Sequence, residues 1–555
     1  MPERKRKGRW LLRILAVIGL FILLGVIYIL IVSRTNPPKV TDKIALEWER
    51  TEPSPGLYVV KNNWFRKSKS GLYELYVEGR PFERGVVNGK LSKELIQLQE
   101  DYFNDQITKM IPSKFYRHFL KYVIGWFNRD LDKYVSEEDK EEIYGISLSA
   151  SDKYAYIGNN YQRILNYHAA HDIGHALQNL ALVGCTSFGT WGSRSADSTL
   201  IIGRNFDFYV GDHFSENKIV SFEKPSDGFK FMYVSWGGFI GVVSGMNEKG
   251  LTVTINAAKS DIPSGSATPV SLVAREILQY AENIQEAMSI AKKRKMFVSE
   301  SFLIGSSEDN KAVIIEKTPD SLGLYDPGKN EIICANHFQS KELNGLSSNK
   351  IQIRQSASEY RYQRMVELLA SAEKNTVAKT VQILRDRAGL ENTDIGTGNE
   401  KAVNQLIAHH SIIFEPQKKL VWVSTGPWQL GEFVCYDLNK VFSMDGMKTN
   451  REIMDSSLNL PADSFLLSDK YRQFLKYRSY KKEIKEGKNI NPDSLIASNP
   501  NYYQAYQLAG NEMFRTKQYE KAIGYYRQAL SKEIATKTEE NEIRNQIYKS
   551  EEKLR

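Results

Sequence analysis

A long hydrophobic segment stands near the start of the chain. Residues 14–32 (ILAVIGLFILLGVIYILIV) are nineteen in number and include no charged side chain, and six basic residues crowd the first thirteen positions. About twenty apolar residues are needed for a helix to cross a bilayer. Since basic flanks stay in the cytoplasm, the pattern predicts a cytoplasmic tail at 1–13 and a single-pass signal anchor at 14–32. The rest of the chain would then lie on the extracytoplasmic side of the cell membrane.

Two other interpretations of this segment are open. One is a cleaved signal peptide, but IVSRTNPPKV, at the end of the segment, offers no small-x-small cleavage site. The other is a buried core helix, which the basic flank and the length of the segment fit less well.

The pattern after the hydrophobic segment predicts an α+β body. A proline-rich linker occupies 33–56. Residues 57–184 are predicted to be a mainly helical upstream segment, in which a strand and a glycine-containing turn precede the helices. Residues 185–445 form the predicted catalytic body. Up to about 340 the pattern predicts strands, interrupted by the amphipathic helix SLVAREILQYAENIQEAMSIAKK; a helical pattern follows at 356–390, and HSIIFEPQKKLVWVSTGPW predicts a closing hairpin. Strands flanked by helices indicate a layered domain.

The last part of the chain has a helical repeat pattern. We expect a helix-containing linker at 446–495 and a tail at 496–555 that resembles a tetratricopeptide repeat (TPR). Small and aromatic residues stand at that repeat's spacing: Gly510, Ala522, Tyr526 and Ala529. A plain helical hairpin is the alternative. Because one repeat cannot bury both of its faces, the tail is expected to pack on the body or on a protein partner.

Charge and cysteine content exclude some classes of function. The formal net charge of +9 comes largely from the N-terminal cluster. No other stretch forms a basic stripe with interleaved aromatics, so nucleic-acid binding is not expected. The three cysteines, Cys185, Cys334 and Cys435, are too few and scattered for a disulfide framework or a thiolate metal site. One pair could still form a disulfide.

A histidine cluster raises the question of a metal. His168, His171 and His175 stand at i, i+3 and i+7, with Asp172 beside them, and could bind zinc from one helix face. A polar helix face or histidines satisfied within the core are the alternatives. Gly174 weakens the helix and no HExxH pattern is present. We therefore predict neither a metal nor a cofactor.

Cys185 stands in a setting that suggests chemistry. In VGCTSFGTWGSRSADSTLIIGRNFDF it follows Gly184, and Arg204 and Asp207 stand in the second extended stretch. Charged residues within an apolar strand are costly unless they are paired. An inward-facing arginine and aspartate could stabilise a thiolate and orient an amine. From the residues alone, a nucleophile and a small buried cysteine remain equally open.

This stretch resembles the nucleophile strand and hairpin of the N-terminal-nucleophile (Ntn) cysteine hydrolases. Within them it is most similar to the penicillin acyltransferase-type autoproteolytic acyltransferase/hydrolase family, which is related to the choloylglycine (bile salt) hydrolases. Further segments match in the same order across about 75–440: GRPFERGVVNG, GFIGVVSGMNEKGLTVTINAAKS, ICANHF, SEYRYQRM and HHSIIFEPQKKLVWVSTGPW. Each segment is weak alone, and their shared order makes the match specific. The resemblance implies a four-layer αββα sandwich made as an inactive precursor.

The resemblance also implies self-cleavage between Gly184 and Cys185. The Cys185 sulfur would attack the Gly184 carbonyl, and hydrolysis of the thioester would leave fragments of 184 and 371 residues from the 555-residue precursor. A free α-amine in a peptide has a pKa of about 8, so the new amine could accept the thiol proton without a separate histidine.

Further site residues follow from the resemblance alone. Asp207 matches the aspartate that holds the amine and the thiol, and Arg204 matches an arginine near the nucleophile of bile salt hydrolases. Asn256 and Asn336 match asparagines near the tetrahedral centre, where one N–H donor can contribute roughly 3 kcal/mol. Arg361 matches an arginine that supports the nucleophile.

Arg364 is the alternative to Arg361 if the register of SEYRYQRM shifts. The implied activity is that of a membrane-anchored amidohydrolase or N-acyltransferase. It would act on linear C–N amide bonds of small or lipid-like N-acyl compounds through a cysteinyl thioester. The alternative is a non-catalytic, membrane-tethered scaffold that recruits partners through its TPR-like tail.

Overall fold

The computed structural model describes residues 2–177, 184–209, 211–259, 265–371 and 374–555. Its larger sheet has eleven strands in the order β1-β2-β3-β4-β7-β8-β9-β10-β11-β12-β13. Their bounds are β1 (Thr51–Ser54), β2 (Leu57–Val60), β3 (Asn63–Lys67), β4 (Tyr73–Gly79), β7 (Ile219–Pro225), β8 (Phe231–Ser235), β9 (Ser244–Asn247), β10 (Leu251–Ala257), β11 (Glu300–Ser306), β12 (Lys311–Lys317) and β13 (Leu322–Tyr325). Within this sheet β4 and β7 pair in parallel, and the other neighbours are antiparallel.

The smaller sheet has six antiparallel strands in the order β14-β5-β6-β15-β16-β17. Their bounds are β5 (Thr186–Thr190), β6 (Ile201–Phe206), β14 (Glu331–Cys334), β15 (His410–Glu415), β16 (Leu420–Ser424) and β17 (Phe433–Asp437). The two sheets stack face to face, since Val220 and Ile314 of the larger sheet share one buried cluster with Ile202 and Ile412 of the smaller one.

Helices cover the outer face of each sheet. On the larger sheet, Ile143 of α6 and Ile277 of α8 pack in one core with Val253 of β10. On the smaller sheet, Met365 of α11 and Val381 of α12 pack in another. The helices of the body are α2 (Pro81–Leu91), α3 (Lys93–Met110), α4 (Lys114–Phe127), α5 (Leu131–Tyr134), α6 (Glu137–Ser147), α7 (Asn160–Leu177), α8 (Val270–Tyr280), α9 (Ile284–Lys293), α10 (Ser347–Gln355), α11 (Ser358–Ala370), α12 (Val377–Leu384) and α13 (Leu438–Phe442). The body is therefore a four-layer αββα sandwich.

The upstream segment contributes more strand than its sequence predicted. Residues 57–184 were expected to hold one strand before their helices, yet β2, β3 and β4 all lie there, and β1 falls within the predicted linker. Two glycines with positive φ explain how such short strands pair. Gly56 (φ 75°) lies between β1 and β2, and Gly71 (φ 89°) lies between β3 and β4. Glycine adopts this backbone conformation at no steric cost, which permits tight turns.

A buried ion cluster joins the upstream segment to the rest of the body. Arg84 of α2 pairs with Glu142 of α6 at 2.6 Å. Arg275 of α8 pairs with the same Glu142 at 2.8 Å and with Glu223 of β7 at 2.6 Å. All four side chains are at most 1% exposed. Because removing one partner would leave an uncompensated buried charge, the cluster ties α2 and α6 firmly to β7 and α8.

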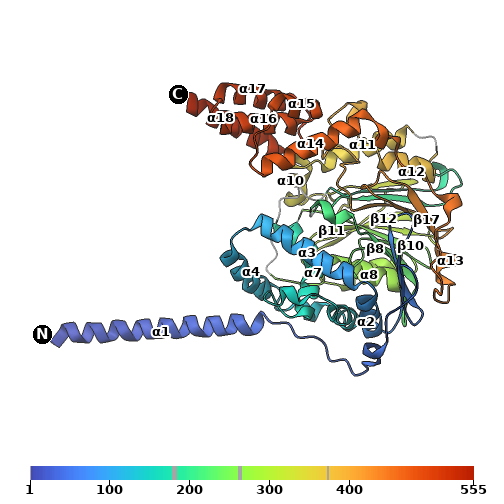
Figure 1. Cartoon of the computed structure of the whole chain (residues 1–555), viewed down its shortest axis with the longest axis horizontal. Helices are drawn as coiled ribbons and strands as arrows, with labels where there is room; N and C mark the ends of the chain where they lie inside the picture. Colours follow the sequence, from blue (N-terminus) through green and yellow to red (C-terminus); the bar gives the residue numbers. More distant parts are fainter. Residues whose placement is uncertain (1, 178–183, 210, 260–264, 372–373) are drawn as a thin grey trace.

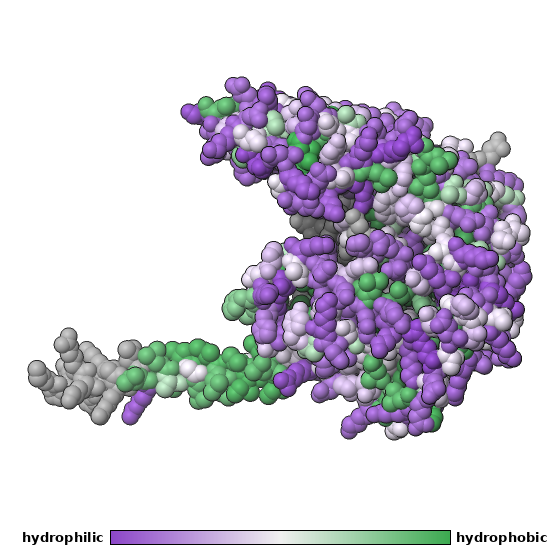
Figure 2. Space-filling view, viewed as in Figure 1, coloured by the Kyte–Doolittle hydropathy of each residue, from purple (hydrophilic) through white to green (hydrophobic). Residues whose placement is uncertain are grey.

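The N-terminal helix α1 (Pro2–Val32) projects alone from the body (Figure 1). Its segment Leu12–Val32 has a mean hydropathy of 3.2 and is not buried, and it forms the green rod in Figure 2. In length and composition it is able to cross a membrane. The predicted N-terminal apolar helix is present, and its insertion into a bilayer stays a prediction.

The C-terminal tail is helical and packs on the body (Figure 1). Its helices are α14 (Asp469–Lys485), α15 (Pro492–Ser498), α16 (Tyr503–Arg515), α17 (Tyr519–Leu530) and α18 (Lys537–Leu554). Leu406 and Leu430 of the body share a buried cluster with Tyr503 of the tail. At the crossing of α16 and α17, a Cβ on Gly510 would lie 2.5 Å from the Tyr526 ring. This small-residue contact is what the repeat pattern requires, and the assignment as a TPR stays a prediction.

Candidate active site

The register of β5 and β6 brings the predicted site residues to Cys185. β5 starts immediately after Cys185 and pairs antiparallel with β6, so that Ser187 lies opposite Arg204. Arg204 Nη2 donates a hydrogen bond to Cys185 Sγ at 3.5 Å. The backbone carbonyl of Asp207 accepts from the Gly184 N–H at 3.0 Å and from Cys185 Sγ at 3.8 Å. The spacing of about twenty residues between Cys185 and the Arg204–Asp207 segment is therefore the length of the β5–β6 hairpin.

The other hydrogen bonds of Arg204 hold its guanidinium beside the Cys185 sulfur. Its guanidinium donates to the carbonyl oxygens of Val243 and Ile255 and to Ser244 Oγ. Burial raises the pKa of the Cys185 thiol to about 11, and the nearby charge of Arg204 opposes that rise. The thiol is therefore neutral at physiological pH, and Cys185 is only 1% exposed.

Asp207 lies between two arginines. Burial raises the pKa of its carboxyl to about 7, while the charges of Arg361 and Arg204 act to lower it. Among the described residues, neither carboxylate oxygen of Asp207 has a hydrogen-bond partner. A buried carboxylate with unused acceptors and a pKa near neutrality is suited to receive a cation or a proton.

The two arginines considered for the site lie on α11 and make different contacts. Arg361 donates from Nη2 to Asn336 Oδ1 at 2.6 Å and from Nη1 to the Glu400 carbonyl at 3.0 Å. Arg364, one turn later, instead binds both carboxylate oxygens of Asp386 at 2.9 Å. Arg361 is thus directed toward the site, and the alternative residue makes an ion pair elsewhere.

The two predicted asparagines connect the two sheets. Asn256 of β10 donates from Nδ2 to the carbonyl oxygens of Cys334 and Ala335, and its Oδ1 accepts from Ser187 Oγ at 3.0 Å. Asn336 donates from Nδ2 to the Ala257 carbonyl at 2.8 Å. The amide donors of both asparagines are therefore engaged by backbone carbonyls, and the two residues fix the end of β14 against β10.

Gln405 is a site residue that the sequence analysis missed. Its Nε2 donates to the carbonyl oxygen of Gly184 at 2.7 Å. The approach is so close that a Cβ on Gly184 would lie 2.3 Å from the same nitrogen. The glycine before the cysteine is the only sequence signal for this contact, because Gln405 is 221 positions away from Gly184.

A second missed group lies behind Arg204. The Ser244 hydroxyl that accepts from Arg204 is 2.9 Å from His410 Nε2, and His410 Nδ1 is 2.9 Å from His409 Nδ1. Glu300 of β11 is also fully buried nearby, and burial raises the pKa of its carboxyl well above the usual range. The sequence offered no motif for these contacts, because the stacking of the two sheets creates them.

The histidine cluster finds no support as a metal site in the described residues. His168 Nδ1 is 2.8 Å from the Ile164 carbonyl, and Nε2 accepts from the Ile240 N–H at 3.0 Å, so both ring nitrogens are engaged. The side chains of His171 and His175 lie outside the described residues. No group of three or more potential ligands is found in the part of the chain that is described. The three cysteines are free and buried.

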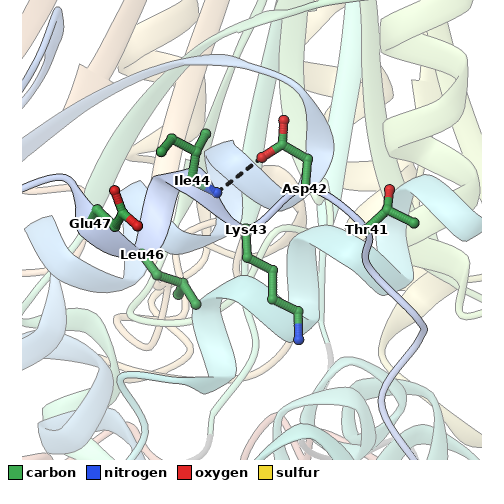
Figure 3. Close-up of a pocket in the computed structure, with 6 residues that line it drawn as sticks. All are labelled: Thr41, Asp42, Lys43, Ile44, Leu46 and Glu47. Carbon is green, nitrogen blue, oxygen red and sulfur yellow. Dashed lines mark hydrogen bonds between the residues drawn. The ribbon is translucent and has the colours of Figure 1, made fainter.

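Two surface hollows have linings that do not include Cys185. Figure 3 shows one formed by the short 3₁₀ segment η1 (Ile44–Glu47) and the residues before it, where Ile44 N–H donates to Asp42 Oδ1 at 3.0 Å. A second is lined by residues such as Arg385, Asp386 and Asp463. Neither has a predicted site residue in its lining.

This chain is similar in sequence to proteins of other organisms. It is 25% identical over 273 residues to an uncharacterized protein of Archaeoglobus fulgidus, covering 46% of this chain and 45% of that protein. It is 24% identical over 276 residues to Protein dcd1B of Dictyostelium discoideum, covering 45% and 51%. The chain thus spans about half the length of these curated relatives.

The chain also matches solved structures, with low identity and low TM-scores. An N-acylethanolamine-hydrolyzing acid amidase ortholog of Caenorhabditis elegans has 17% identity and a TM-score of 0.31, with 42% of this chain and 93% of that chain covered. A mutant conjugated bile acid hydrolase of Clostridium perfringens has 13% identity and a TM-score of 0.31, with 46% and 93% covered.

A family model gives the clearest match. The family described as acyl-coenzyme A:6-aminopenicillanic acid acyl-transferase matches residues 194–427. This range begins after Cys185 and includes five other predicted site residues: Arg204, Asp207, Asn256, Asn336 and Arg361. The family resemblance predicted from the order of the motifs is therefore confirmed: residues 194–427 of this chain match the acyl-coenzyme A:6-aminopenicillanic acid acyl-transferase family.

Proposed function

We propose that this chain is the precursor of a membrane-anchored Ntn cysteine amidohydrolase or N-acyltransferase. It cuts its own backbone between Gly184 and Cys185 and then acts on linear amide bonds of N-acyl compounds. The observation that carries the proposal is the hydrogen bond from Gln405 Nε2 to the Gly184 carbonyl, together with the contact of Arg204 with the sulfur of the next residue.

The first step is an acyl shift within the chain. Cys185 Sγ attacks the Gly184 carbonyl carbon, the C–N bond to Cys185 breaks, and the thiol proton ends on the released amine. The Gln405 N–H stabilises the negative charge that develops on the carbonyl oxygen. Water then hydrolyses the thioester, which yields the Gly184 carboxylate and restores the thiol.

The second activity uses the amine that the cut creates. An α-amine on Cys185 would stand near Asp207, whose buried carboxylate has unused acceptors and can hold the ammonium form. The amine accepts the thiol proton as sulfur attacks the substrate carbonyl, and it protonates the leaving amine. Water or a second amine then resolves the acyl thioester, which gives hydrolysis or acyl transfer.

The decisive experiment is the intact mass of the purified protein. Wild type should split into fragments of 184 and 371 residues, and Cys185→Ala should remain one chain and be inactive. Mature protein is then assayed with N-acyl amino acids of varied chain length, with and without acceptor amines. Uncut wild type that still turns over amides would overturn the mechanism. Uncut, inactive protein that binds partners through its tail would favour the scaffold alternative.

A further inference from the structure

Helix α4 (Lys114–Phe127) carries an apolar stripe on its exposed face. Phe115, Phe119, Val123 and Trp126 follow the i, i+4, i+8 and i+11 spacing of a single helix face. All four are exposed, with Phe115 at 85% and Phe119 at 55%. A helix on a globular protein normally buries such a stripe. In α4 the apolar face points to the solvent instead.

The side of α4 that contacts the body carries Lys121, Gly125 and, at its end, Phe127, which packs against Phe297. Lys121 Nζ donates to the Tyr156 carbonyl at 3.0 Å. Gly125 is buried, and a Cβ there would lie 2.6 Å from Ser33 Cβ. At its start, Ser113 Oγ caps the helix by accepting from the Tyr116 N–H at 3.2 Å. The contacts of Lys121 and Gly125 with the body hold the second half of the helix and leave the stripe facing outward.

The stripe lies where the hydrophobic helix α1 meets the body. Ser33, which packs on Gly125, is the residue that follows the end of α1 at Val32. The residues after α1 are held to the start of α7: Gln162 Nε2 of α7 donates to the Ser33 carbonyl at 2.5 Å, and Nδ2 of Asn159, which precedes α7, donates to the Thr35 carbonyl at 2.9 Å. Figure 1 shows α4 beside the body end of α1, and Figure 2 shows hydrophobic surface there.

The composition of α4 fits a lipid interface. Its sequence, KFYRHFLKYVIGWF, contains aromatic residues and basic residues and no acidic residue. Tyrosine and tryptophan concentrate at the headgroup level of membranes. Helices with an apolar face and a basic polar face lie in the interfacial plane and are attracted by anionic lipids.

We propose that α4 lies in the headgroup layer of the bilayer that α1 crosses, so that the body has a second contact with the membrane. Because α4 contacts the end of the hydrophobic helix α1 through Gly125 and Ser33, a lipid surface is the occupant that fits this face, in preference to a second copy of the chain. The proposal rests on the membrane anchoring in the proposed function, and it is independent of the catalytic chemistry.

The test places a fluorophore on the stripe of the full-length chain in lipid nanodiscs. The Cys185→Ala background keeps the chain uncut, and the remaining cysteines are buried. Bimane is attached at Phe115→Cys, or, as a control, at Arg527→Cys on the exposed side of α17. Phosphatidylcholine–phosphatidylserine discs with doxyl-labelled lipid should quench the Phe115→Cys probe about twofold or more, as interfacial burial requires, and leave the control unquenched. Adding Phe119→Glu and Val123→Glu should reduce the quenching.

Each other result contradicts the proposal in a distinguishable way. Disc-bound protein with an unquenched Phe115→Cys probe would overturn the role of α4 and leave the anchor intact. An unquenched probe in discs that hold two copies of the chain would assign the stripe to a contact between the copies, and this too would overturn the proposed lipid contact of α4. A chain that does not co-purify with discs would overturn both the anchor and the α4 contact, while the self-cleavage assay would still stand on its own.

Discussion

Gln405 Nε2 donates a hydrogen bond at 2.7 Å to the carbonyl oxygen of Gly184. That oxygen belongs to the peptide bond before Cys185, and it would carry the negative charge when sulfur adds to the carbonyl carbon. Removing one donor of this kind typically slows acyl transfer by about 10²–10³-fold. In the proposed self-cleavage, the contact would give Gln405 a role that no motif assigns to it.

The first prediction concerns this donor. Gln405→Ala should slow the appearance of the two fragments about 10²-fold or more, measured by the mass of intact precursor with time. Gln363→Ala, on the exposed side of α11, is the matched control and should mature at the wild-type rate. Equal rates for Gln405→Ala and wild type would remove Gln405 from the mechanism.

The second prediction concerns the glycine itself. In Gly184→Ala the new Cβ would lie 2.3 Å from Gln405 Nε2, so the amide must move away from the carbonyl and self-cleavage should slow. Gly345→Ala, with nothing within 4 Å of its Cβ, should cleave normally. A Gly184→Ala precursor that matures as fast as the control would show that this packing has no influence on the cut.

The third prediction separates the two arginines of α11. Arg361→Lys loses the guanidinium that contacts Asn336 and should lower amide turnover about 10²-fold. Arg364→Lys loses the bidentate contact with Asp386, which should lower the free energy of unfolding by about 1–3 kcal/mol and leave kcat unchanged. Turnover and urea unfolding are measured for both. The reverse pattern would mean that the register of the helix is wrong.

The fourth prediction is a pH dependence of stability. The Asp207 carboxyl has a pKa of 3.8 in its ordinary state and about 7 in the fold. Because the folded pKa is raised, the stability contributed by this proton is fully present below about pH 4 and is lost as the pH rises through about 7. In uncut Cys185→Ala protein, adding Asp207→Asn should therefore raise Tm more at pH 8 than at pH 4. Tm differences that do not vary with pH would contradict this.

The fifth prediction concerns the tail. Gly510→Ala places a methyl group 2.5 Å from the Tyr526 ring and should destabilise the protein by about 1–3 kcal/mol, because the helix crossing is overpacked. Gly524→Ala on α17 has open space around its Cβ and should stabilise the helix by up to about 1 kcal/mol. Thermal unfolding followed by circular dichroism compares the two. Equal effects would argue against a tight crossing of α16 and α17.

The sequence predicted the features that depend on local pattern. Hydrophobic length predicted the apolar helix α1, and alternation predicted most strands of the body. The approach of Arg204 and Asp207 to Cys185 depends on one hairpin, so spacing sufficed. The motif order predicted the αββα layers and the family match to residues 194–427.

The features that could not be predicted from the sequence depend on contacts between segments that are distant along the chain. Gln405 reaches Gly184, and His410 reaches Ser244, only because separate segments meet in the stacked layers. β1–β3 are short strands that lack a distinctive pattern, and their pairing depends on glycine turns and on the edge that β4 provides. The exposed stripe of α4 has the spacing of a buried helix, so its outward orientation required the structure.

The parallel pairing of β4 with β7 has a consequence for protein that has matured. A cut before Cys185 would leave β1–β4 on one polypeptide and β7–β13 on another, within a single sheet. Renaturation would then become a bimolecular reaction that slows on dilution, whereas the precursor folds as one molecule. Mature protein that is fully denatured should consequently recover poorly, and its lifetime would be set by how slowly it unfolds.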